Sequence, residues 1–175
     1  MLAAKYCIGN NLQGTFAFEP TKHLIMRILN EKYAEVAYNP IWQASVITWK
    51  DFASPEQFKE TFKTGIQVLE NHHCTYWVED MKFGKAVPNV VAEWVKADFF
   101  AHVANRGVRK VAFLIEKNPM RKLYADNIKE SIQMAGLQLK YFDNRLEMER
   151  WIRQGEFLSM NDLTRKDGKI HNHYF

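Results

Sequence analysis

The chain has 175 residues, of which 47% are hydrophobic and 14% aromatic. This length suits one domain with terminal extensions, and the apolar content excludes disorder over most of the chain. The net charge is only +4, and the 24 basic residues are interspersed with 20 acidic ones. Because nucleic-acid binders concentrate positive charge on one face or in one run, we expect no nucleic-acid partner.

Cysteine usage and apolar runs predict the compartment. Cys7 and Cys74 stand far apart and form no Cys-x-x-Cys pair, so we expect neither a disulfide framework nor a redox motif. The first residues lack the apolar stretch of a secretory signal, and no run approaches the roughly 18 apolar residues that span a bilayer. We therefore expect a cytoplasmic protein with no integral membrane segment.

The first predicted elements form a β-hairpin. Loop-forming residues dominate positions 1–22, which we interpret as an N-terminal extension. The run 23–29 is compatible with a strand or a helical turn, and its periodicity leaves both open. The β-branched and aromatic runs 33–38 and 41–49 flank Asn39-Pro40, a pair typical of turns, and they predict the hairpin.

A first helix is predicted after the hairpin. Ser54 can cap it, Pro55 suits its first turn, and Gln57 completes a capping box. Its apolar residues recur at three- and four-residue spacing, at Phe58, Phe62, Ile66 and Leu69. Gly65 lies inside this helix, where glycine is unfavourable, and it predicts a close approach to the sheet.

A second helix has apolar residues on more than one face. The strand 75–79 ends at Asp80, and Pro88 then opens a helix over 88–106 that Gly107 ends. Its apolar residues are Val90, Val91, Trp94, Val95, Phe99, Phe100 and Val103. A helix with two apolar faces contacts more than its own sheet, so we predict a homodimer through 88–106.

The remaining elements continue the alternation of strands and helices. The apolar run 109–115 predicts a central parallel strand covered on both faces. Asn118-Pro119 begins a third helix that ends at Gly136, with Leu123, Tyr124, Ile128 and Ile132 inward. A strand at 137–142 precedes a short helix that begins after Asn144 and carries Met148, Trp151 and Ile152, and 155–175 is a polar tail.

The predicted fold class is therefore α/β. A single-domain mixed β-sheet is expected over 23–154, with an antiparallel hairpin at one edge of the parallel strands and crossover helices between them.

Motifs for catalysis, cofactors and metals are weak. The sequence contains no glycine-rich phosphate loop and no nucleophile elbow, so we expect neither an enzyme nor a cofactor. His72-His73-Cys74 is a candidate metal cluster that His171 and His173 would have to complete. Neighbouring side chains of an extended chain point in opposite directions, and an exposed helix end explains the histidines better, so we expect no metal site.

Asp80 is the most interesting carboxylate. It ends a parallel strand, where ligands collect in open α/β sheets. With Lys82, Lys85 and Asn89 in the segment that follows, it defines the candidate surface for a ligand or an unknown protein partner. The structural alternative is that Asp80 only accepts hydrogen bonds from loop amides. A catalytic use of Asp80 with Lys85 is disfavoured because no histidine or serine lies nearby.

Several short patterns resemble the STAS or anti-sigma-factor-antagonist-like superfamily, in its SpoIIAA-like branch of short bacterial proteins. They are Tyr33…Val36-Ala-Tyr38-Asn39, Val46-Ile-Thr-Trp49, Ser54-Pro-Glu-Gln-Phe58, Trp77-Val-Glu-Asp80, Trp94, Val111-Ala-Phe113 and Tyr141-Phe-Asp-Asn144…Glu147…Trp151-Ile152. The resemblance covers about residues 33–153. It implies helices packed largely on one face of a mixed sheet.

The resemblance also implies a non-catalytic regulatory or protein-interaction module. In regulated members a serine or threonine after the acidic strand end is phosphorylated, but the segment 81–91 contains no serine, threonine or tyrosine. The alternative function is a small-molecule or lipid-binding domain with a pocket between sheet and helices, lined by residues such as Trp77, Phe83, Trp94 and Phe99.

Overall fold

The computed structural model describes residues 25–154, which form one six-stranded sheet with strand order β1-β2-β3-β4-β5-β6. The strands are β1 (Met26–Asn30), β2 (Ala34–Asn39), β3 (Ala44–Trp49), β4 (Tyr76–Asp80), β5 (Lys110–Leu114) and β6 (Gln138–Phe142). The pairs β1–β2 and β2–β3 are antiparallel, and the other pairs are parallel. The predicted hairpin and the mixed α/β sheet are confirmed, and the open choice at 23–29 is a strand from Met26 onward.

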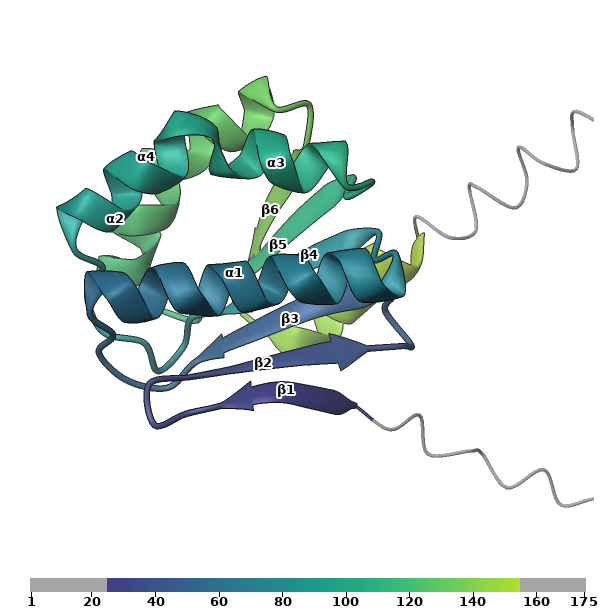
Figure 1. Ribbon diagram of the computed structural model, residues 1–175, viewed down its shortest axis with the longest axis horizontal. Coiled ribbons are helices and arrows are strands. Elements are labelled where there is room, and N and C mark those ends of the chain that lie inside the picture. Colours follow the sequence, from purple (N-terminus) through teal and green to yellow (C-terminus); the bar gives the residue numbers. More distant parts are fainter. Residues whose placement is uncertain (1–24, 155–175) are drawn as a thin grey trace, which may run out of the picture.

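Helices cover both faces of the sheet unequally (Figure 1). One face carries α1 (Pro55–His72), α2 (Asn89–Trp94), α3 (Phe100–Asn105) and α4 (Pro119–Met134), with one π-helical turn (Val95–Phe99) between α2 and α3. The helix 145–154, yellow-green in Figure 1, lies behind the sheet on the other face. The predicted extension 1–22 and tail 155–175 lie outside the described residues.

The alternation of side chains along β5 explains why two layers form. Val111 and Phe113 point into the larger core under α1 and α4, whereas Ala112 and Leu114 join a second core with Met148 and other residues of helix 145–154. A strand buried on both faces has a continuous apolar sequence, which is why the run 109–115 predicts a central strand. No helix within residues 25–154 has the length and apolar character needed to cross a bilayer.

The first helix begins as predicted and lies close to the sheet. Ser54 Oγ accepts the Gln57 N–H at 3.3 Å, and Gln57 Oε1 accepts the Ser54 N–H at 2.8 Å, which completes the capping box. The predicted approach at Gly65 is confirmed. Ser45 Oγ donates to the Gly65 carbonyl at 3.0 Å, and a Cβ on Gly65 would lie 2.6 Å from the Trp77 ring.

The apolar faces of the segment 88–106 are covered by the chain's own helices. This segment contacts both α1 and α4. Phe99 stacks on Phe62 of α1 with ring centroids 4.7 Å apart, and among its large hydrophobic side chains Val90 is the exposed one. The pattern that suggested a homodimer therefore has an explanation within one chain.

One prediction about α4 is wrong. Leu123, expected inward, is 68% exposed, whereas Tyr124, Ile128 and Ile132 are buried. At about 100° per residue, Leu123 lies on the side of α4 opposite to the buried stripe that Tyr124, Ile128 and Ile132 share, so it faces solvent. The fully buried Arg121 lies one turn before Tyr124 on the same face of α4. Because it is charged, the spacing of apolar residues does not predict that it belongs to this buried face.

Candidate functional site

The segment 81–88, which we call the β4 loop, lies at the carboxyl edge of the parallel strands. Because β3, β4 and β5 are parallel neighbours, the loops that follow them leave the sheet side by side. Asp80 ends β4, and its Oδ1 accepts the Lys82 N–H at 3.2 Å. This is the hydrogen bond that the structural interpretation of Asp80 predicts.

A second residue fixes the β4 loop from the side of α4. Asn118 Nδ2 lies within hydrogen-bond distance of the carbonyls of Met81 (3.2 Å), Lys82 (3.3 Å) and Gly84 (3.0 Å). Its Oδ1 accepts the Arg121 N–H at 3.2 Å and so caps α4. A single side chain thereby ties the loop to the helix, and the β4 loop is held firmly although it is a connection.

The four predicted site residues do not converge on one point. Lys82 contacts Asp80 through its backbone, while its Nζ lies 3.5 Å from the Glu116 carboxylate and 5.6 Å from the centre of the Phe83 ring. Lys85 and Asn89 are exposed, and neither side chain forms a hydrogen bond or ion pair with any residue in 25–154.

Asp80 also lines a cavity on the second face of the sheet. This cavity has a volume of about 180 Å³ and lies between the sheet and helix 145–154. Its polar lining consists of Arg27, Glu35, Asn39, Thr48, Asp80 and Arg145. These residues come from four strands and one helix, so no local sequence motif could have collected them.

The four residues expected to line an apolar pocket lie in different surroundings and do not line a common cavity among the described residues. Trp77 and Phe99, two of its expected lining residues, are buried in the larger core with ring centroids 5.4 Å apart. Phe83 is 69% exposed, and Trp94 packs against Phe62 at 5.9 Å. Around Trp77 and Phe99 the aromatic side chains fill the space between sheet and helices with one another.

A buried carboxyl group lies beneath the β4 loop. Glu79 is fully buried, and its two oxygens accept the indole N–H groups of Trp77 at 2.8 Å and Trp49 at 3.0 Å. Burial raises the pKa of Glu79, because the charged form loses water, while the two indoles and Arg121 oppose this effect. The aromatic pattern of the sequence alone does not predict this site.

A buried guanidinium group accompanies it. Arg121 lies over the rings of Trp49 (5.2 Å) and Phe58 (5.5 Å), and no residue in 25–154 is a hydrogen-bond partner of its three side-chain nitrogens. Burial lowers the pKa of Arg121 to about 10, although Glu79 acts in the opposite direction. A Cβ at Gly84 would overlap this guanidinium, so glycine is what lets the β4 loop close over it.

The raised pKa of Glu79 predicts a pH dependence of stability. From the ordinary value of 4.5 up to the folded value, the folded state retains a proton that the unfolded chain has released. Stability therefore falls as pH rises through this window. Urea unfolding of the wild type and Glu79→Gln between pH 4.5 and 8 should show the difference in unfolding free energy, wild type minus variant, decreasing with pH. A constant or growing difference contradicts the assignment.

The three adjacent residues of the candidate metal cluster, His72, His73 and Cys74, have different local environments. His72 stacks on Tyr38 with ring centroids 4.1 Å apart, and His73 ends α1 with a left-handed backbone. Cys74 is buried, which raises the pKa of its thiol to about 12. Within the described part of the chain no three His, Cys, Asp or Glu side chains are grouped to hold a metal, and His171 and His173 lie outside it.

Comparison with known proteins adds no assignment. No protein-family model matches the chain, and neither a curated protein nor a solved structure matches it.

Proposed function

We propose that this domain is a non-catalytic interaction module that docks a protein partner at the carboxyl edge of its sheet. The observation that carries the proposal is Phe83, which is 69% exposed although the β4 loop that bears it is held by Asn118 and Asp80. Aromatic side chains, phenylalanine among them, are enriched at protein interfaces relative to the rest of the surface. A loop that is already ordered loses little conformational freedom on binding.

The surroundings of Phe83 indicate the chemistry of the partner. Phe52, in the β3–α1 loop, and Met120, in the first turn of α4, are also exposed on neighbouring connections. Lys82 and Lys85 flank Phe83, and 81–91 contains no acidic residue. A complementary partner has an apolar pocket for the ring with carboxylates around it.

This role agrees with what the STAS-like resemblance implies, and we propose it for a STAS-like domain over 23–154 of a cytoplasmic bacterial protein. The proposal includes no phosphorylation at 81–91, because that segment has no hydroxyl group. The proposal also does not include a homodimer through 88–106, because the apolar residues of this segment pack against α1 and α4 of the same chain.

Site-specific crosslinking in the native cells tests the proposal. A photoreactive phenylalanine analogue placed at position 83 should give a discrete adduct with one other protein. The same analogue at position 134 is the control, because Met134 is 81% exposed but lies at the opposite end of α4. Lys82→Glu with Lys85→Glu should reduce the adduct about tenfold if the partner is acidic.

Two outcomes contradict the docking surface. One is an adduct of equal yield from positions 83 and 134, which means that exposure alone determines the reaction. The other is no adduct from position 83 in cells where the protein is folded, as judged by its resistance to proteolysis.

A further inference from the structure

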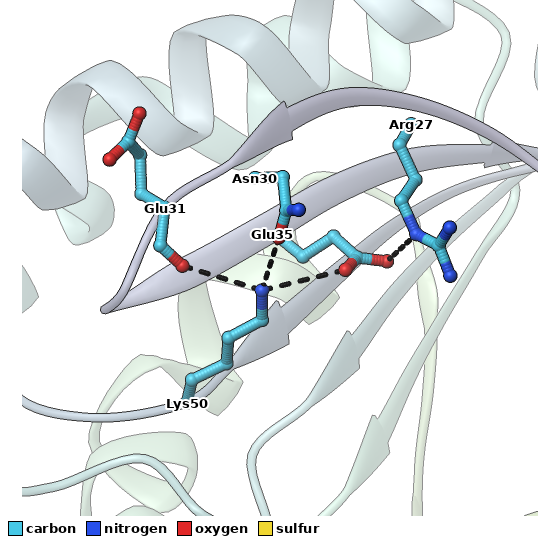
Figure 2. A network of polar contacts seen from close by, with 5 residues as sticks. All are labelled: Arg27, Asn30, Glu31, Glu35 and Lys50. Atoms are coloured by element: carbon cyan, nitrogen blue, oxygen red, sulfur yellow. Dashed lines mark hydrogen bonds and ion pairs between the residues drawn. The ribbon is translucent and has the colours of Figure 1, made fainter.

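The cavity on the second face carries an inference that does not depend on the docking surface. The carboxylates of Glu35 and Asp80 both line this cavity, and they differ in how far neighbouring cations neutralise them. Glu35 on β2 lies 3.1 Å from Arg27 Nε and 3.5 Å from Lys50 Nζ, and Lys50 is held in turn by Asn30 Oδ1 at 2.6 Å (Figure 2). This network binds Glu35 to two cations, so its charge is already balanced.

Asp80 has no cation within ion-pair distance among the described residues; burial raises its pKa, and the more distant charges of Lys82 and Arg145 oppose this only in part. It is half-buried, its Oδ1 accepts only the Lys82 N–H, and no ion pair within residues 25–154 includes it. Its other oxygen accepts no hydrogen bond from a described residue. A partly desolvated carboxylate that lines a cavity is suited to bind an ammonium group, because an opposite charge compensates for the water it has lost.

The same cavity is also lined by a cation. Arg145, at the start of helix 145–154, donates from Nε to Glu149 at 2.8 Å and stacks on the Trp42 ring with its Cζ 4.9 Å from the centroid. The two terminal nitrogens of Arg145 make no hydrogen bond to any residue in 25–154, so both remain available to donate to a ligand. A guanidinium held in this way matches a carboxylate, which it can bind with two parallel hydrogen bonds.

Size and lining restrict the ligand further. The apolar part of the lining includes Val46, Val78 and Met148. Its volume of about 180 Å³ is comparable to cavities of roughly 150 Å³ that hold benzene, so it accommodates a molecule of about ten non-hydrogen atoms.

We infer that this cavity binds a small zwitterion of the amino-acid class, with its ammonium group on Asp80, its carboxylate on Arg145 and a short aliphatic side chain over Val46 and Val78. A simple carboxylic acid would leave Asp80 unpaired, and a simple amine would leave Arg145 without an anion. The combination of both charges therefore distinguishes this ligand from the two simpler ones.

Thermal shift and methyl NMR with the full chain test the inference. The probes are glycine, L-alanine and L-valine at concentrations on the order of 10 mM. At this concentration even a ligand with a Kd in the millimolar range raises Tm. Isobutylamine and isovalerate are the matched controls, because each lacks one charged group of valine. We expect at least one amino acid to raise Tm and to move the Met148 methyl signal, and each control to bind about 10-fold or more weakly.

Variants locate the bound molecule. Asp80→Asn keeps an oxygen for the Lys82 N–H but loses the charge, and Arg145→Gln loses the guanidinium, so each should weaken binding about 10- to 100-fold. Arg150→Gln is the control, because Arg150 is exposed on the same helix and does not line the cavity. Three results overturn the inference: no amino acid binds, the amine or acid binds equally well, or Asp80→Asn binds like the wild type. None of them bears on crosslinking at position 83.

Discussion

Replacing Glu79 by leucine is expected to lower the free energy of unfolding by about 3–5 kcal/mol. The substitution removes the acceptor of two buried indole N–H groups, from Trp49 and Trp77, and each unsatisfied donor costs about 1–3 kcal/mol. It also removes the carboxyl group whose charged form stabilises the buried Arg121. Urea unfolding followed by far-UV circular dichroism measures the change.

A large loss of stability alone has many causes. A second substitution, at Arg121, should restore part of the lost stability if the explanation is right. Adding Arg121→Met to Glu79→Leu removes the charge that was left without compensation, and methionine fills a similar volume. The double variant should be more stable than Glu79→Leu by about 2 kcal/mol, so the two substitutions are not additive. If Arg121→Met destabilises both backgrounds equally, Glu79 and Arg121 act independently and the explanation is wrong.

The pair Glu79 and Arg121 also shows why part of the core escaped prediction. The sequence pattern places Trp77 on the buried face of β4, and the same alternation places Glu79 beside it. A glutamate at that position contradicts the rule that charged residues lie outside, so the apolar pattern of the strand does not predict that it is buried. Trp49 and Trp77 lie on different strands, so no local pattern shows that their indole N–H groups share the Glu79 carboxyl group as acceptor.

Local signals predicted local features well. The capping box at Ser54, the stop at Gly107 with its φ of 91° and the turn after β2 each depend on a few neighbouring residues. The candidate site is different, because Arg27 and Arg145 are far from Asp80 in sequence and meet it only once the sheet order is known. Asp80 was identified from its place at a strand end, whereas the cavity depends on helix 145–154 crossing to the other face.

Substituting valine for Gly65 is expected to destabilise the fold by about 3 kcal/mol. A Cβ at this position would lie 2.6 Å from Cη2 of Trp77 and 3.3 Å from Cδ1 of Ile47. The Trp77 ring cannot move aside easily, because it is fully buried and its N–H is bound by Glu79 at 2.8 Å. The helix cannot move away either without breaking the hydrogen bond from Ser45 Oγ to the Gly65 carbonyl.

A matched substitution separates packing from helix propensity. Gln67→Val lies two residues further along α1 at an exposed position, so it changes propensity without a steric clash and should cost less than about 1 kcal/mol. Gly65→Val should therefore be less stable than Gln67→Val by about 2 kcal/mol or more in urea unfolding. Its tryptophan emission should also shift to longer wavelength as the Trp77 ring gains water. Equal stability of the two variants would mean that α1 can move from the sheet at little cost, and that Gly65 does not set their separation.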